Sequence, residues 1–377
     1  MASRPRALTF GLPRMHKEAG ERRDFLPPLV GKLADRGVEV YVEGGIGSGM
    51  GFRDQDYTDL SPLVHVVTNE EAFRADVVLT LRCPDEAEFL QLRPGSILFA
   101  MLHLPTRPDR VRMLGELGVE GISMDSITDD SGRRLVIDSR DVAWNGVEAA
   151  FDALERAWSE LEDPGRRPVR VTLVGPGEIG KHAVEAATKY GNVERAARLA
   201  RAGLLGVEVV VVGRNLSGDA EHMRARFRET DVLVDASQRD DPSQPLVPNA
   251  WIADLPEHAV ICDLVVDPYL PDADPPTVRS IEGIPQGNLD QWIFTPDDPA
   301  WDRLPPGVPT ANRRTVASCY SWPGIHPMPC MELYGTQLGP LLETLIRAGG
   351  MGGLHAEGSY HERALHRASL RAWVGMD

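Results

Sequence analysis

The sequence predicts an α/β fold of two domains, each built on a parallel sheet that is covered by helices. The chain has 377 residues, of which 42% are hydrophobic and 25% are charged. At about 150 residues per domain, this is enough apolar material for two cores. Short apolar runs alternate with amphipathic stretches, as in successive βαβ units. The alternation stops at DPGRRP (163–168) and then begins again.

The first part of the chain alternates strands with helices. A helix is expected over 24–36, because Pro27 and Pro28 can occupy its first turn and Gly37 can end it. Two further helices are expected over 85–92 and 107–117. The strands expected around these helices are 6–12, 38–44, 76–81, 96–102 and 118–124.

A second alternating pattern starts at residue 169. A long helix is expected before it, over 141–160, where apolar residues recur at three- and four-residue spacing. The helix after the first of the new strands is expected to extend into 191–203, and residues 268–316 show little periodicity. The later strands and helices are expected over 207–213, 231–237, 259–266, 330–349 and 359–373.

The break predicts where the domains divide. We expect a discontinuous substrate domain of residues 1–140 plus 317–377 and a second, dinucleotide-binding domain of residues 141–316. The active site is expected in a cleft between the two, because ligands of open α/β sheets bind outside the carboxyl ends of the strands.

Charge and cysteine content exclude several classes of function. Lys and Arg number 40 against 56 Asp and Glu, for a net charge of −16. A general nucleic-acid binder or a protein docked on an anionic membrane needs a basic surface instead. No apolar run approaches the roughly 18 residues of a membrane span. The four cysteines are scattered without a Cys-x-x-Cys pair. We therefore expect free buried thiols, no metal site and a cytoplasmic location.

The stretch VTLVGPGEIG predicts a dinucleotide-binding loop. Gly175, Gly177 and Gly180 follow an apolar strand and open a helix. The first glycine permits the tight turn, the second lets the backbone approach a pyrophosphate, and the third lets helix and strand pack closely. Glu178 and Ile179 then lie in the first helical turn, beside the free N–H groups that attract a phosphate. A glycine-rich turn without a ligand is the alternative.

The end of the following strand bears on the choice of cofactor. Many NAD sites have a carboxylate there, which accepts hydrogen bonds from the ribose hydroxyls. This chain has Gly213, Arg214 and Asn215 instead. Arg214 can form charge-assisted bonds with a 2′-phosphate, so NADP is favoured over NAD. The alternative is an exposed arginine on a loop.

Several polar residues lie near the ends of the expected strands in the first domain. His103 follows SILFAML, and Arg82 follows VVLTL. Arg22 and Arg23 lie just before the first helix. A single histidine is more often structural, and each arginine alone would be expected at the surface. Together, however, these arginines can hold a carboxylate.

The chain resembles a superfamily that contains alanine dehydrogenase, the transhydrogenase α-subunit and lysine-forming saccharopine dehydrogenase. The matching segments occur in the same order over roughly residues 6–340. They are GLPRMHKEAGERRDFLPPLVGKLADRGVEVYVEGGIGSGMGF, ADVVLTLRCP, GSILFAMLHL, VGPGEIG and VICDLVVDP.

The resemblance implies a role for each matching residue. His103 matches the catalytic histidine, and Asp267 matches an aspartate near the nicotinamide and the substrate nitrogen. Arg22 matches the arginine that binds the substrate carboxylate. Arg82 stands where two of these enzymes have a functional lysine. Because an arginine cannot act as a proton shuttle, this difference and the divergent segment SCYSWPGIHPMPCMELYG favour a substrate other than alanine.

Together these observations predict an NAD(P)-dependent oxidoreductase that acts on a C–N bond next to a carboxylate. A 2-oxo acid would be reductively aminated by ammonia, or by an amino acid to give an opine of the saccharopine or N-(carboxyethyl)ornithine type. The opine version is slightly favoured. Alanine dehydrogenase activity, a transhydrogenase-like hydride carrier and a non-catalytic nucleotide sensor are the alternatives. The resemblance also implies a homo-oligomer.

Overall fold

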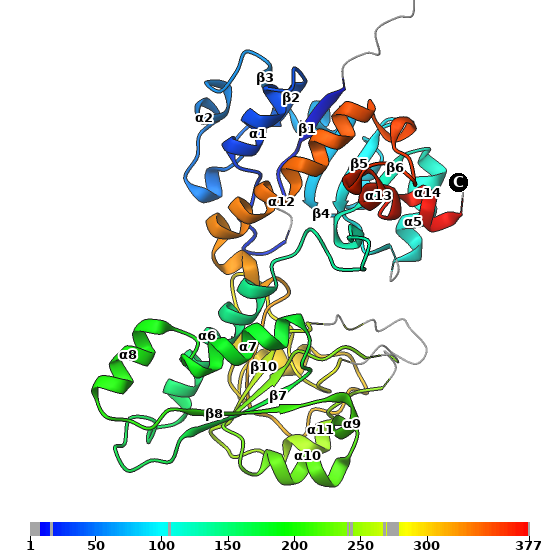
Figure 1. The fold of residues 1–377 in the computed structure, drawn as a ribbon. Helices are drawn as coiled ribbons and strands as arrows, with labels where there is room; N and C mark the ends of the chain where they lie inside the picture. Colours follow the sequence, from blue (N-terminus) through cyan, green and yellow to red (C-terminus); the bar gives the residue numbers. More distant parts are fainter. Residues whose placement is uncertain are drawn as a thin grey trace, which may run out of the picture. The chain divides into compact units, whose positions relative to one another are not determined.

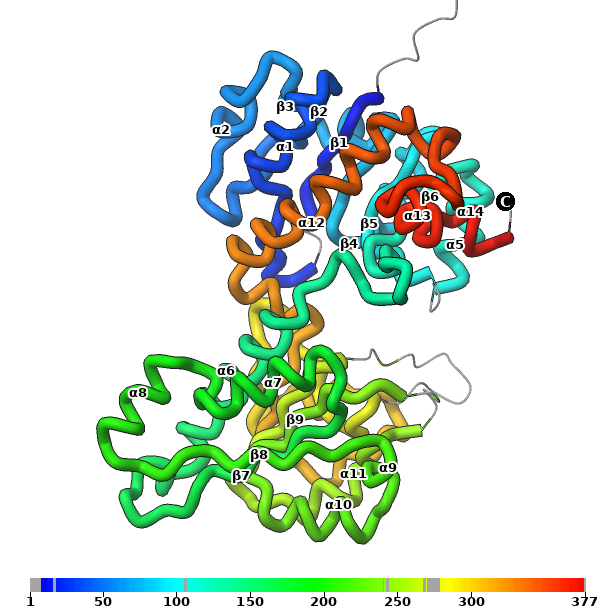
Figure 2. The backbone as a smooth tube through the Cα atoms, viewed as in Figure 1, coloured from blue at the N-terminus to red at the C-terminus, as the bar shows by residue number. Residues whose placement is uncertain are grey.

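The computed structural model describes residues 8–15, 18–104, 107–239, 241, 244–266, 269 and 279–375. The chain forms two compact units, drawn as a ribbon in Figure 1 and as a tube in Figure 2. The first comprises Met1–Asp138 and His326–Asp377, and the second comprises Ser139–Ile325. The chain returns to the first unit after Ile325, whereas the predicted boundary lay after residue 316, nine residues earlier. The reason is that Thr315–Ser318 is a strand of the second sheet.

The first unit contains a six-stranded parallel sheet with the order β3-β2-β1-β4-β5-β6. The predicted strands of this half are present, and one strand, β3, was not predicted. The strands are β1 (Thr9–Leu12), β2 (Glu39–Glu43), β3 (Val64–Val67), β4 (Val77–Arg82), β5 (Ile97–Met101) and β6 (Glu120–Ser123).

Helices from both ends of the chain cover this sheet. The long helix α12 packs against α1 and α13, although it lies about 300 residues after α1 in the sequence. Its buried Leu338 and Leu342 join Phe10 and Phe99 of the strands in one core. The helices are α1 (Pro27–Ala34), α2 (Asp54–Thr58), α3 (Asn69–Phe73), α4 (Glu86–Phe89), α5 (Pro108–Leu117), α12 (Pro327–Ala348), α13 (Tyr360–Arg367) and α14 (Leu370–Val374).

The second unit contains a six-stranded sheet with the order β11-β12-β10-β9-β7-β8. Only the β11–β12 pair is antiparallel. Both faces are buried, because Val232 and Val234 of β9 lie in one core cluster and Leu233 lies in another. The strands are β7 (Val169–Val174), β8 (Val207–Val212), β9 (Val232–Asp235), β10 (Val260–Asp263), β11 (Ile293–Phe294) and β12 (Thr315–Ser318).

The helices of the second unit differ from the prediction at one point. Instead of one extended helix, α7 (Glu178–Thr188) ends before a turn and α8 (Val193–Arg201) follows separately. Gly191 has a φ of 71°, and a Cβ there would lie 2.4 Å from the Cα of Glu148, so the chain must turn. The other helices are α6 (Ser139–Ala157), α9 (Arg214–Ser217), α10 (Ala220–Phe227) and α11 (Asn249–Ile252).

The cysteines are all free thiols, as predicted. Cys262, Cys319 and Cys330 are buried, and Cys83 is half-buried. Burial raises the pKa of the Cys83 thiol to about 11 and that of Cys330 to about 12. Among the described residues, none of the helices is both long enough and apolar enough to span a membrane.

Candidate functional site

His103 stands at the carboxyl edge of the first sheet and is held by a carboxylate. It lies two residues after β5 and has a φ of 50°, a left-handed conformation that is uncommon outside glycine. Its backbone N–H donates to Asp125 Oδ1 at 3.1 Å, and its ring Nδ1 lies 3.4 Å from Asp125 Oδ2. The imidazole is 49% exposed, whereas the Asp125 side chain is 8% exposed.

Asp125 is ionised because its hydrogen bonds outweigh its burial. Burial by itself raises the pKa of this carboxyl. Hydrogen bonds from His103 and from the Ser123 hydroxyl (2.8 Å) hold the pKa of Asp125 well below its ordinary value. A fixed negative charge therefore faces the Nδ1 side of the imidazole, and it favours the tautomer that carries its proton on Nδ1.

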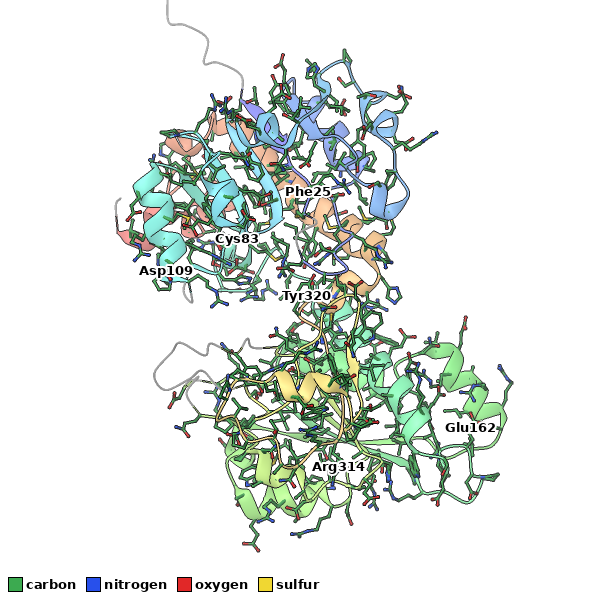
Figure 3. The ribbon with its side chains drawn as sticks, turned by 180° about the vertical axis from the view of Figure 1, so that it is seen from behind. Phe25, Cys83, Asp109, Glu162, Arg314 and Tyr320 are labelled. Atoms are coloured by element: carbon green, nitrogen blue, oxygen red, sulfur yellow. The ribbon has the colours of Figure 1, made fainter. Side chains whose placement is uncertain are left out.

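Arg82 lies beside His103 on the same edge. It ends β4, and its Cα partner on β5 is Met101, two residues before His103. Its Nη2 donates to Glu18 Oε1 at 2.6 Å. The next residue, Cys83, marks this position in Figure 3. Arg82 therefore lies at the end of a strand, as expected from the sequence, and its partner Glu18 comes from the loop after β1.

The two adjacent arginines before α1 have opposite environments. Arg22 is exposed, as expected for an arginine at the surface. Arg23 is 2% exposed and donates from Nε (2.9 Å) and Nη2 (2.6 Å) to the two carboxylate oxygens of Glu21. Arg23 Nη1 also lies 3.8 Å from the sulfur of Cys330 on α12. The expectation of a surface position was therefore wrong for Arg23, because a glutamate two residues away pairs with it in the core.

The predicted glycine loop forms a tight turn between β7 and α7. Gly175 has a φ of 100°, and a Cβ there would lie 2.4 Å from the carbonyl oxygen of Ala236. A Cβ at Gly180 would lie 2.0 Å from the carbonyl oxygen of Gly175, so this glycine lets α7 approach β7. A Cβ at Gly177 would meet no atom within 4 Å. The space beside Gly177 at the start of α7 is open to a ligand.

Neighbouring positions complete this edge of the second sheet. Glu178 is exposed and Ile179 is half-buried. The backbone N–H of Gly175 donates to the carbonyl of Val212 at 3.1 Å, and Val212 is the last residue of β8. Arg214 and Asn215 follow directly in α9, and both are exposed. Arg214 is thus at the strand end next to the glycine loop, as the sequence predicted.

Comparison with known proteins identifies similar proteins. Residues 11–139 match the family model described as alanine dehydrogenase/PNT, N-terminal domain. An alanine dehydrogenase from Geobacillus stearothermophilus is 28% identical over 275 residues, which cover 69% of this chain and 72% of that protein. The NAD(P) transhydrogenase subunit alpha of Haemophilus influenzae is 22% identical over 90% of this chain and 66% of its own length.

The chain is similar to alanine dehydrogenases and to the transhydrogenase α-subunit, and the family model covers its N-terminal part. The family model and these two relatives confirm the predicted resemblance to alanine dehydrogenase and the transhydrogenase α-subunit. Two solved structures of the superfamily show the same fold. They are an L-alanine dehydrogenase, with a TM-score of 0.72 at 21% identity, and a transhydrogenase from Sinorhizobium meliloti, with a TM-score of 0.63 at 18% identity. The first match covers 96% of this chain and 94% of the other, and the second covers 95% and 97%.

The remaining predicted residue is not placed. Asp267 lies outside the residues that the structure describes, so its role stays a prediction. The residue before it, Val266, has a φ of 53°. A β-branched residue in this conformation is a genuine outlier, and such strain is often found beside functional sites.

Two carboxylates that pair with residues singled out in the sequence were not themselves identified there. Asp125 directly follows the predicted strand 118–124. An acidic residue at the carboxyl end of a strand could have indicated a functional position. Glu21 was the other, and the spacing Glu-x-Arg in GERR could have indicated its pairing with Arg23. In both cases the decisive fact is burial, which the local sequence does not show.

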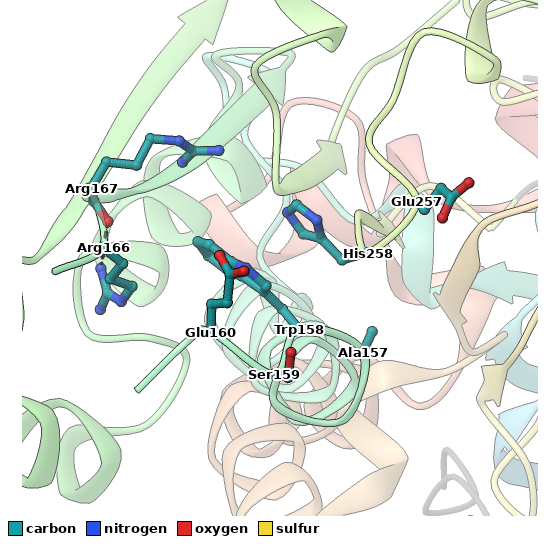
Figure 4. Close-up of a pocket in the computed structure, with 8 residues that line it drawn as sticks. All are labelled: Ala157, Trp158, Ser159, Glu160, Arg166, Arg167, Glu257 and His258. Atoms are coloured by element: carbon teal, nitrogen blue, oxygen red, sulfur yellow. Dashed lines mark hydrogen bonds between the residues drawn. The ribbon is translucent and has the colours of Figure 1, made fainter. Parts of the chain in front are cut away.

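A separate pocket of about 530 Å³ lies at the opposite edge of the second sheet (Figure 4). It is lined by residues that precede β7 and β10, including Arg167, and by Trp158, whose ring stacks on His258 with centroids 4.7 Å apart. Arg167 donates two hydrogen bonds to buried Asp231 at 2.7 and 2.9 Å, and His258 Nε2 lies 2.8 Å from the same carboxylate. These groups already satisfy one another, so the glycine loop remains the candidate nucleotide site.

Proposed function

We propose that this protein is an NAD(P)-dependent oxidoreductase that acts on the CH–NH bond of an amino acid or of an opine-type secondary amine. The observation that carries the proposal is the pair formed by His103 and Asp125 at the carboxyl edge of the first sheet. The glycine loop of the second unit supports it. Relatives named alanine dehydrogenase and NAD(P) transhydrogenase support the same class of reaction.

The second unit would hold the cofactor. The open space at Gly177 and the amino end of α7 suit a pyrophosphate, which the backbone N–H groups can bind. Arg214 would pair with the 2′-phosphate of NADP, and Asn215 would offer a neutral hydrogen bond. When bound, the nicotinamide supplies or accepts the hydride.

The first unit would supply acid–base chemistry. Asp125 holds the Nδ1 side of His103, so Nε2 is the atom that would exchange a proton with the oxygen of the carbonyl or carbinolamine. Asp125 also stabilises the imidazolium that forms when His103 takes up a proton. The resemblance gives Asp267 the role of hydrogen-bonding the substrate nitrogen. The reaction requires these groups and the nicotinamide to reach the same substrate.

Arginines would bind the substrate carboxylate. Arg22 is exposed, and Arg82 presents its guanidinium on the same edge as His103. Glu18 compensates part of the Arg82 charge when no substrate is bound. Glu18 would yield to a substrate carboxylate, which can accept two parallel hydrogen bonds from one guanidinium. Arg82 would orient the carboxylate and would not transfer protons, because an arginine cannot act as a proton shuttle.

The proposal also includes the identity of the amine that reacts with the oxo acid. We favour an amino acid, and hence an opine product, because Arg82 stands where two of the similar enzymes have a lysine and cannot act as a proton shuttle. The segment SCYSWPGIHPMPCMELYG also diverges from alanine dehydrogenase. Ammonia as the amine would give an amino-acid dehydrogenase, and alanine dehydrogenase activity is the nearest such alternative. A cytoplasmic homo-oligomer remains a prediction.

A substrate panel tests the proposal. Purified protein is mixed with NADPH or NADH, a set of 2-oxo acids, and either ammonia or individual amino acids, and cofactor oxidation is followed by absorbance. The expected result is oxidation that requires both an oxo acid and an amine. Binding of nucleotide without turnover in any combination would favour the non-catalytic sensor instead.

A further inference from the structure

We propose that Arg110 is a positioning residue, which holds the backbone beside His103 and so fixes the direction of the imidazole. The inference rests on the proposed function, because it concerns the rate of that reaction. Arg110 lies in the first turn of α5, and its Nη1 donates to the backbone carbonyl of Leu102 at 2.8 Å. Asp109, the residue before it, is labelled in Figure 3. Arg110 is not among the residues that the sequence predicted for the site.

The peptide unit between Leu102 and His103 is held at both of its polar atoms. Its carbonyl oxygen accepts from Arg110, and its N–H donates to Asp125 Oδ1 at 3.1 Å. Both partners are charged, so both hydrogen bonds are of the stronger, charge-assisted kind. Because a peptide unit is planar, two fixed points set the orientation of the whole plane. The position of the His103 Cα follows from that plane.

His103 needs this hold because its backbone is strained. Its φ of 50° lies in the left-handed region, which residues other than glycine rarely adopt. Such a conformation persists only where the surroundings determine it more strongly than the local preference opposes it. The imidazole is 49% exposed, so packing around the ring supplies little of that constraint. The hydrogen bonds at the two ends of the peptide unit act directly on the strained backbone.

The helix that carries Arg110 is itself anchored beside the end of β5. Leu114 of α5 is fully buried, in the same core cluster as Leu102 and Leu104. These two leucines lie on either side of His103 in the sequence. The guanidinium of Arg110 therefore extends from a packed helix, and a group on a rigid element positions its partner more precisely than one on a loop.

The stability of α5 does not account for an arginine at this position. The first turn lies at the positive end of the helix dipole, where acidic residues are favoured and cations are not. Asp109 in this turn agrees with that preference, whereas Arg110 opposes it. The hydrogen bond that Arg110 makes is to the Leu102 carbonyl, which lies outside the helix. A role at the end of β5 therefore explains the position of Arg110 better than a role within α5.

Two variants on the same helix test the proposal. Arg110→Met removes the N–H donors and keeps an apolar stem. Arg112→Met is the matched control, because the Arg112 side chain is 69% exposed and pairs with Asp109 of the same helix at 2.9 Å. Both variants are compared with the wild type for melting temperature, NADPH and NADH dissociation constants, and kcat and KM on the best substrate of the panel.

We expect Arg110→Met to lose about 10- to 100-fold in kcat, with KM and both dissociation constants within about twofold of the wild type. Arg112→Met should match the wild type throughout. Arg110→Lys keeps a charged donor and should remain within about fivefold of the wild-type kcat. Equal kcat values in folded Arg110→Met and Arg112→Met would overturn the proposal. If Arg110→Met does not fold, Arg110→Gln takes its place, with an expected loss of about three- to tenfold because a neutral donor remains.

A double-mutant cycle shows whether Arg110 acts through His103. If it does, Arg110→Met changes the residual kcat of His103→Ala by less than about twofold, although it lowers the kcat of the wild type by about tenfold or more. Equal losses in the two backgrounds would mean that Arg110 acts through another group, and would contradict the positioning role.

Hydrogen exchange at the His103 amide separates this proposal from the proposed function, because it needs no turnover. The chain has 10 histidines, so isotope-labelled histidine gives few amide signals, and the one missing in His103→Ala identifies His103. Exchange should be at least about tenfold faster in Arg110→Met than in Arg112→Met, because loss of the carbonyl contact loosens the peptide unit. This difference without any turnover in the wild-type protein would refute only the proposed reaction. Equal exchange rates and equal kcat values, with normal wild-type turnover, would refute only the role of Arg110.

Discussion

Asp125 contacts His103 at two points, through the backbone N–H at 3.1 Å and the ring Nδ1 at 3.4 Å. The carboxylate thus fixes both the strained backbone of His103 and the face that its imidazole presents. A buried, ionised carboxylate that orients an exposed histidine is an arrangement suited to general acid–base catalysis. The relationship gives a physical reason for a positive φ at a residue other than glycine.

Replacement of His103 by alanine should abolish most turnover and leave cofactor binding nearly intact. A positioned acid–base group typically contributes about 10²- to 10⁴-fold to the rate. The loss should appear in kcat, while NADPH and NADH titrations give dissociation constants close to those of the wild type. Retention of more than half of the wild-type kcat would remove His103 from the mechanism.

Replacement of Asp125 by asparagine should lower kcat by about 10- to 100-fold, because the imidazole loses its fixed charge and its orientation. It should also change the pH dependence of stability. The pKa of Asp125 is lower in the folded state than in the unfolded state, since its hydrogen bonds outweigh its burial. Its stabilisation is therefore present above the ordinary carboxyl pKa of about 4 and is lost as pH falls through the lowered value.

Urea unfolding of this variant between about pH 7 and about pH 3 checks the sign. The free energy of unfolding should decline less steeply with acid in Asp125→Asn than in the wild type. If the free energy of unfolding falls equally with acid in both proteins, the charge of the Asp125 carboxylate does not contribute to stability.

Arg22→Ala should raise KM for the oxo acid without loss of stability. A charge-assisted contact to the carboxylate contributes about 1.5–3 kcal/mol, or roughly 10- to 150-fold in KM. The adjacent Arg23→Ala is the matched comparison. It leaves Glu21 buried without its partner and should cost about 3–5 kcal/mol of stability. If KM of every carboxylate substrate is unchanged in Arg22→Ala, Arg22 is a surface residue only.

Arg214 should decide the preference for NADP. The net charge of −16 repels a 2′-phosphate at long range, so NADP binding needs a local cation. Arg214→Ala should weaken NADPH binding by about 1.5–3 kcal/mol and hardly change NADH binding. Gly213→Asp should shift the preference towards NADH, by accepting ribose hydroxyls and repelling phosphate. Equal losses for both cofactors would show that Arg214 supports the loop or stacks on adenine, and a wild-type preference for NADH would overturn the NADP prediction.

Local patterns predicted the sheets and the tight turn of the glycine loop. Apolar runs such as 96–102 and 231–237 are buried on both faces in a parallel sheet, so their strand character is visible in the sequence. The three glycines of the loop are determined by backbone geometry, which allows no side chain at Gly175 or Gly180. The oxidoreductase class predicted from this loop together with the family resemblance agrees with the names of the relatives.

What the sequence did not show depends on contacts distant along the chain. The strand β12 is only four residues long and is stabilised by pairing with β10, so the second domain boundary was placed too early. Arg23 is buried because Glu21 and Cys330 surround it, and the second of these lies 307 residues away. The cleft predicted between the domains concerns the relation of the two units and stays a prediction.

Transfer of deuterium tests the central claim most directly. The protein is incubated with C4-deuterated NADPH or NADH, a reactive 2-oxo acid and its amine partner, and the product is analysed by mass spectrometry. The proposed reaction predicts an amine product with one deuterium on the carbon that carries both the nitrogen and the carboxylate. A product without deuterium, or a deuterated hydroxy acid in its place, would contradict hydride transfer to a C–N bond.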